Sequence, residues 1–120
     1  MATPHYLNQS ERAISINVTI AITWPTTRIT SVILHMASAP VTAGNIYIYT
    51  DMRVGSGSEL VTSTPTFPAL LHTNEMLGKT DLIWLPGWQL WAPIGDSLRV
   101  VYTNPDAITW FLRMVVEEWD

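Results

Sequence analysis

The side chains best suited to catalysis or metal binding are few in this chain of 120 residues and lie far apart in the sequence. Its histidines are His5, His35 and His72, and none has a second histidine or a carboxylate at the spacing of a metal site. The chain has no cysteine, which rules out disulfides and thiolate metal ligands. We therefore expect neither a metal site nor a cofactor.

No nucleophile motif stands out either. Gly55-Ser56-Gly57 shares the composition of the G-x-S-x-G nucleophile elbow but not its pattern, and it is more typical of a flexible loop. Carboxylates at predicted strand ends or turns are expected to accept backbone N–H bonds. These carboxylates are Asp51, Asp81, Asp96 and Asp106. The sequence predicts no catalytic residue, and we expect the protein not to be an enzyme.

The six tryptophans are the main chemical feature of the chain. Exposed tryptophans on a β-sandwich can stack on sugar rings, whereas others fill the core or anchor a protein partner. Strand parity puts Trp88 and Trp91 on opposite faces, so the tryptophans cannot all share one flat platform. Core packing or a subunit interface is therefore preferred over glycan stacking. The candidate interface residues are Tyr47, Tyr49, Trp88, Trp91 and Trp119.

Composition narrows the class of partner. Charged residues make up 13% of the chain, about half the usual share, so we expect much of the surface to meet protein. The net charge of −4 and the scattered arginines argue against a nucleic-acid partner. No segment approaches the roughly 18 apolar residues of a membrane span, and residues 1–12 lack the apolar core of a secretion signal. We expect synthesis in a host cytoplasm and no membrane partner.

Strands must position these residues, because apolar and polar residues alternate along most of the chain. The alternation between residues 12 and 23 turns five residues the same way: Ile14, Ile16, Val18, Ile20 and Ile22. Only short strands are expected at 60–64 and 67–72, because Pro65 and Pro68 interrupt them. Further strands are predicted over 28–38, 46–52, 80–85, 97–103 and 108–116.

Strands of this number, separated by turn signals, are typical of a β-sandwich or barrel. We expect an all-β, antiparallel two-sheet sandwich with jelly-roll-like connections. An immunoglobulin-like sandwich is the alternative, although the Cys…Trp…Cys landmark is absent. Residues 1–11 are predicted to form an N-terminal arm and residues 12–120 a single domain. The long strands at 12–23 and 108–116 are expected to pair.

Residues 30–110, about two thirds of the chain, resemble small, uncharacterised structural proteins of tailed bacteriophages. Turn and strand motifs in a fixed order carry the resemblance, and each motif alone is only turn chemistry. The Trp88-Gln89-Leu90-Trp91 segment departs from the pattern. The matching segments are Ile33-Leu34-His35, Ala39-Pro40-Val41-Thr42-Ala43-Gly44-Asn45, the strand from Ile46 to Asp51, Thr80-Asp81-Leu82-Ile83-Trp84, Pro93-Ile94-Gly95-Asp96-Ser97-Leu98-Arg99-Val100 and Tyr102-Thr103-Asn104-Pro105-Asp106.

The resemblance implies a β-sandwich component of the virion, usually oligomeric and without enzymatic activity. The leading hypothesis is a capsid decoration (cement) protein on the capsid surface, a homotrimer that bridges major capsid protein subunits and stabilises the phage head. A tail, neck or baseplate component is the alternative within the virion. A carbohydrate-binding module that uses exposed tryptophans is the alternative outside it.

Overall fold

Strands account for all the regular secondary structure that is described. The computed structural model describes residues 2–11, 14–53, 66–87, 89–92 and 94–119, and this part of the chain contains no helix. The strands are β1 (Ala2–Glu11), β2 (Ile16–Ala21), β3 (Thr27–Met36), β4 (Asn45–Arg53), β5 (Thr66–Glu75), β6 (Asp81–Trp84), β7 (Leu90–Ala92), β8 (Ser97–Tyr102) and β9 (Trp110–Trp119).

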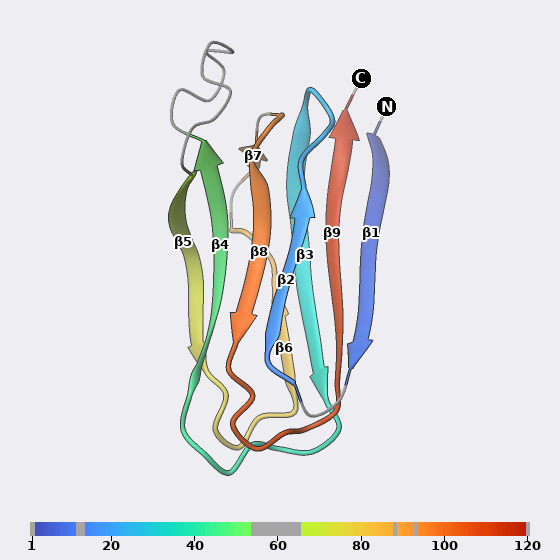
Figure 1. The fold of residues 1–120 in the computed structure, drawn as a ribbon. Helices are drawn as coiled ribbons and strands as arrows, with labels where there is room; N and C mark the ends of the chain where they lie inside the picture. Colours follow the sequence, from blue (N-terminus) through green and yellow to red (C-terminus); the bar gives the residue numbers. More distant parts are fainter. Residues whose placement is uncertain (1, 12–13, 54–65, 88, 93, 120) are drawn as a thin grey trace.

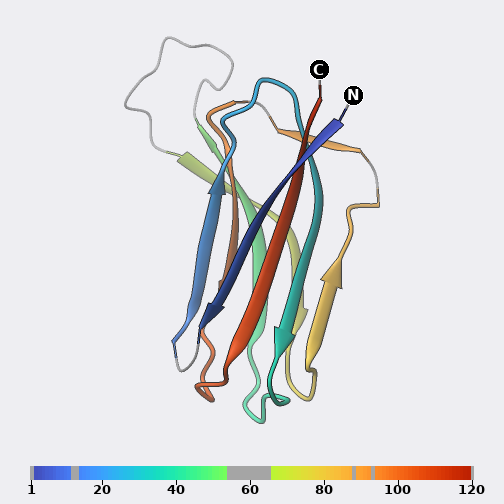
Figure 2. The ribbon, with the colours of Figure 1, turned by 90° about the vertical axis from the view of Figure 1, so that its right-hand side faces the viewer.

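The strands form two antiparallel sheets (Figures 1 and 2). Sheet A has the order β1-β9-β3-β6, with β7 also paired to β3, and sheet B has the order β2-β8-β4-β5. The pairings are nested, since β1 pairs with β9, β2 with β8, β3 with β6 and β7, and β4 with β5. The chain is thus one long ribbon, doubled back between β4 and β5 and rolled into two layers. This arrangement confirms the expected sandwich with jelly-roll connections.

Two expectations about the ends of the chain are wrong. The predicted arm over residues 1–11 is largely β1, which pairs with β9 along ten residues and forms an edge of sheet A. The predicted partnership of the strands at 12–23 and 108–116 is not formed either, because β2 pairs with β8 in the other sheet. The alternation rule missed β1 because no residue of this edge strand is fully buried.

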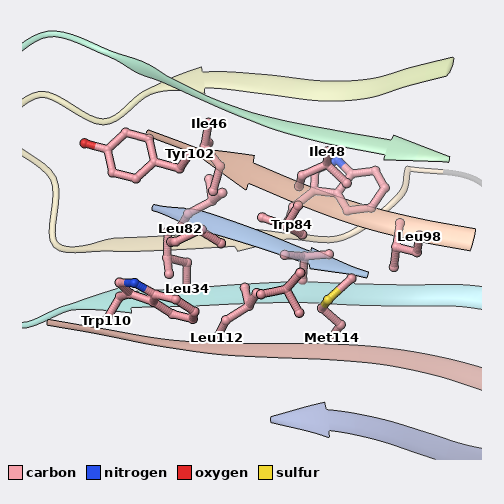
Figure 3. Packing of buried hydrophobic residues seen from close by; sticks show 14 of the residues in the cluster. Leu34, Ile46, Ile48, Leu82, Trp84, Leu98, Tyr102, Trp110, Leu112 and Met114 are labelled. Carbon is pink, nitrogen blue, oxygen red and sulfur yellow. The ribbon is translucent and has the colours of Figure 1, made fainter. Parts of the chain in front are cut away.

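The core lies between the two sheets and follows the predicted alternation (Figure 3), except at Ile14, which is 48% exposed and lies before β2 begins. Trp84 and Trp110 belong to it, and the ring of His72 stacks on that of Trp84 with centroids 6.0 Å apart. Among the described tryptophans, these two are therefore core residues. The largest fully buried side chains include Ile16, Leu34, Met36, Ile46, Ile48, Leu98, Tyr102, Trp110 and Leu112.

The strand expected at 60–64 and Pro65 lie outside the described residues, and the strand expected at 67–72 is part of β5, which runs through Pro68. β5 forms the edge of sheet B, where Pro68 stands opposite Asp51 of β4. A proline is tolerated there because one side of an edge strand carries no ladder hydrogen bonds. Pro68 therefore does not end the strand, because β5 lies at the edge of the sheet.

Carboxylates hold the loops by hydrogen bonds at the end of the sandwich opposite the chain termini. Asp106 accepts hydrogen bonds from the backbone N–H groups of Val41 and Thr42, each at 3.0 Å, and from the Thr42 hydroxyl at 2.7 Å. Glu75 accepts the backbone N–H of Gly44 at 2.6 Å. These bonds lower the pKa of both carboxyl groups. The turn role expected for Asp106 is confirmed, whereas the side chain of Asp51 lies outside the described residues.

Asn104 holds the loop before β9 in place. Its backbone has a φ of 52°, a left-handed conformation that asparagine tolerates better than most residues. Its buried side chain donates to the carbonyl oxygens of Ile14 and Ile108, at 2.7 and 2.9 Å, and accepts the N–H of Ile108 at 3.1 Å. The Trp110 indole N–H donates to the same Ile14 carbonyl at 3.2 Å. These hydrogen bonds connect the segment before β2 of sheet B with the start of β9 in sheet A.

Candidate interaction surface

The outer face of sheet A exposes several large aromatic and aliphatic side chains. In an antiparallel sheet, directly paired residues share a face, so the register places alternate residues of β1, β9, β3 and β6 on the outside. Tyr6, Ile83, Trp91 and Trp119 lie on this face with 56%, 66%, 45% and 37% of their surface exposed. We call it the sheet A face. Figure 2 shows β1, β9, β3 and the short β6 of this sheet side by side, with β1 and β9 in front.

One corner of the sheet A face is formed by Trp91 and Trp119, two of the predicted interface residues. Their rings meet edge to face, with centroids 6.1 Å apart and planes at 71°. The guanidinium of Arg28 lies 5.8 Å from the centroid of the Trp119 ring. It also donates to Glu117 at 2.6 and 3.0 Å. A hydrogen bond of 2.8 Å from the Trp119 N–H to the Thr26 carbonyl fixes this strand end.

The middle of the sheet A face is held by Arg113. Its Nε donates to Oδ1 of Asn8 at 2.8 Å, and its guanidinium lies 5.5 Å from the ring of Tyr6. Arginine stacked on an aromatic ring keeps its charge while it covers apolar surface. β1 is thereby tied to β9 through side chains as well as backbone.

The opposite edge of the sheet A face carries a histidine–carboxylate pair. His35 Nδ1 lies 2.7 Å from Oδ1 of Asp81, and the Thr80 hydroxyl donates to Oδ2 of Asp81 at 2.9 Å. The hydrogen bond from His35, and then that from Thr80, lower the pKa of Asp81. Two arginines and two carboxylates therefore face outward from sheet A, which balances its formal charge although the whole chain carries −4.

The other two predicted interface residues that are described lie on the opposite side of the molecule. Tyr47 and Tyr49 point outward from β4 in sheet B, with ring centroids 6.1 Å apart and planes at 20°. The guanidinium of Arg99 lies 4.8 Å from the Tyr49 ring. The predicted residues thus form two separate pairs on two faces. The fifth, Trp88, lies outside the described residues.

Sequence reasoning missed three polar and aromatic members of the sheet A face: Tyr6, Arg28 and Arg113. Tyr6 is not expected on a sheet, because the sequence predicts an arm over residues 1–11. Arg28 and Arg113 become visible only through the pairing of β1, β9 and β3, which brings distant residues together. Their exposure on an apolar surface is what suggests a role in binding.

The described residues contain no cluster of three or more histidine and carboxylate side chains arranged to hold a metal ion. No helix long and apolar enough to cross a membrane occurs in the described part of the chain.

No family model matches the chain, and no curated protein matches it either. Among solved structures, the chain is similar to a chain in the structure of infectious bursal disease virus, Gx strain, with 11% sequence identity and a TM-score of 0.49. The likeness covers 98% of this chain and 33% of that chain. This chain therefore spans about a third of the viral chain. A likeness at this level does not bear on function, and the resemblance to tailed-phage proteins stays an expectation.

Proposed function

We propose that this protein is a non-enzymatic structural component of a virion. In the specific form of the proposal, it decorates the capsid as a cement protein that associates with itself, as a homotrimer, and bridges subunits of the major capsid protein. The observation that carries the proposal is the sheet A face, which presents exposed aromatic and aliphatic side chains with balanced charges. The resemblance of residues 30–110 to phage structural proteins supports the choice of a virion.

The chemistry of the sheet A face suits a protein partner. Interface centres are enriched in tryptophan, tyrosine and arginine and depleted in unpaired charges. Here Arg28 and Glu117 already neutralise one another, and Arg113 already has Asn8 and Tyr6 as neighbours. A partner that covers this face therefore meets Arg28 already neutralised by Glu117, whereas Arg113, whose neighbours are neutral, needs an acceptor from the partner.

The geometry of the tryptophans favours protein over sugar. A sugar ring stacks best on a flat aromatic surface, whereas Trp91 and Trp119 meet at 71° and offer no shared plane. Two indoles that meet edge to face instead offer an uneven apolar surface, which suits the side chains of a protein partner. A carbohydrate-binding module remains the competing function, and the experiment below separates the two.

The test is binding to heads of the parent virus assembled without this protein. Trp91→Ala and Trp119→Ala should each weaken binding at least about tenfold, as expected for residues at the centre of an interface. Val41→Ala is the matched control, because Val41 is 81% exposed in the loop before β4 and lies outside the sheet A face. Unchanged binding in both tryptophan variants would contradict the proposal.

Copy number in the particle decides between the virion alternatives. A number close to that of the major capsid protein supports a cement protein, and a small fixed number supports a tail, neck or baseplate component. Loss of binding to a glycan array in the tryptophan variants, with capsid binding intact, would support the carbohydrate-binding module instead.

A further inference from the structure

We propose that β1 is an exchangeable strand, which leaves its own sheet and pairs with β9 of a second copy of this chain. The inference rests on the proposed function and adds to it the strand pairing through which copies of the chain associate. It is carried by the way in which β1 is attached to the rest of the molecule, at the edge of sheet A beside β9 (Figure 2).

β1 is held mainly through its backbone. All ten of its residues are at least partly exposed, and Leu7 is the apolar residue that packs partly against the core. In contrast, β9 contributes Trp110, Leu112, Met114 and Val116 to the core. Elements with few buried apolar contacts open at a lower free energy than the global unfolding of a domain. β1 can therefore detach while the core of the sandwich stays closed.

The side-chain contacts of β1 join it chiefly to β9 and can be re-formed between two copies. Nε2 of His5 lies 3.1 Å from Oε1 of Glu118, and the His5 ring stacks on Trp24 with centroids 3.9 Å apart. Asn8 receives the hydrogen bond from Arg113. The same atoms meet when β1 comes from a neighbour, so the exchanged and closed forms share the β1–β9 ladder. Exchange of an identical element is for this reason a low-cost route to oligomers.

The sequence of β1 favours exchange over the simple addition of another strand to its free edge. Pro4 has no N–H to donate, and proline on an edge strand is a common means of preventing edge-to-edge pairing. In the closed molecule, in contrast, β9 pairs with β1 of its own chain along ten residues. Copies that associate through these strands are thus expected to pair β1 of one copy with β9 of the other.

Cysteine pairing tests the inference cleanly, because the chain has no cysteine of its own. Asn8 and Arg113 are directly opposed in the ladder, close enough for a disulfide. A tagged Asn8→Cys chain and an untagged Arg113→Cys chain are refolded together and oxidised. A disulfide between the two chains forms in this ladder only if β1 of one copy lies on β9 of the other. We expect a heterodimer band on a non-reducing gel that shifts to monomer mass with reductant.

The control pairs Asn8→Cys with Thr19→Cys, which is exposed on β2 in sheet B. The double variant Asn8→Cys/Arg113→Cys, which should close its disulfide within one chain, shows that the geometry allows the bond. If that disulfide closes, a heterodimer yield no greater than that of the Thr19→Cys control overturns the inference. Ser10→Cys with Phe111→Cys, also directly opposed, repeats the test with the Asn8–Arg113 hydrogen bond intact. The gel reports strand exchange alone, so its failure leaves the capsid-binding test of the proposed function standing.

Discussion

Arg28 donates from both Nε and Nη2 to one carboxylate oxygen of Glu117, at 3.0 and 2.6 Å, while its guanidinium faces the Trp119 ring. The two residues are directly paired on β3 and β9. Their side chains are 28% and 21% exposed, so water screens this ion pair less than one on an open surface. The pair therefore fixes the corner of the sheet A face and adds no net charge to it.

A double-mutant cycle measures this ion pair. We expect a coupling free energy of about 1 kcal/mol between Arg28→Ala and Glu117→Ala, at the upper end of the range for surface pairs because the geometry is doubly hydrogen-bonded. Chemical denaturation of the four proteins gives the value. The cycle for Asn8→Ala and Arg113→Ala, a single exposed hydrogen bond, should give a smaller coupling. Equal coupling in the two cycles would contradict this interpretation.

The inward faces of most strands could be predicted from the sequence because a strand repeats every two residues. Leu34 and Met36 of β3, Leu98 of β8 and Leu112 of β9 are buried as the alternation requires. Burial on one face is a local pattern, and a single sequence displays it directly. The sandwich followed from it, together with the turn residues between the strands.

The sheet A face could not be predicted in the same way, because it depends on a bulge. Simple alternation places Arg28 on the same side as Val32, which is buried. The register of β3 against β9 shifts between Ile29 and Ser31, so Arg28 turns outward and reaches Glu117. A bulge adds one residue to a strand and leaves no periodic signal. The aromatic members Trp91 and Trp119 were proposed from residue type alone, and their contact required the tertiary fold.

Replacement of Asn104 should destabilise the fold. Asn104→Ala removes three side-chain hydrogen bonds and leaves the carbonyl of Ile108 and the N–H of Ile108 without these partners in a buried loop. We expect a loss of about 3 kcal/mol in the free energy of unfolding. Asn104→Gly removes the same bonds but adopts the positive φ freely, so it should be about 1 kcal/mol less damaging than alanine. Urea denaturation compares the two, and losses below about 1 kcal/mol in both would contradict the role assigned to the side chain.

Removal of the Tyr102 hydroxyl should not harm the protein. This oxygen is buried and has no hydrogen-bond partner among the described residues, and burial raises the pKa of the phenol above its ordinary value of 10.0. Above that pH the unfolded chain loses the proton more readily than the folded one, so stability falls as the pH rises. Tyr102→Phe should leave stability at neutral pH unchanged or up to about 1 kcal/mol higher. It should also reduce the alkaline loss, and thermal unfolding at neutral pH and above pH 10 measures both effects.

Acid should weaken the hydrogen bonds by which Asp106 holds the loop at Val41 and Thr42. The hydroxyl of Thr42, followed by the backbone N–H groups, holds the pKa of Asp106 below its ordinary value of 3.8. The folded state therefore binds fewer protons than the unfolded state in this range, and the stability present above pH 3.8 is lost as the pH falls through the folded pKa. Asp106→Asn should be less stable than the parent near neutral pH, with a difference that shrinks below pH 3.8. Urea denaturation at a series of pH values follows this difference. Thr42→Val removes the main donor and should reduce the same acid dependence, whereas a difference that stays constant across the series would show that the charge of Asp106 contributes nothing.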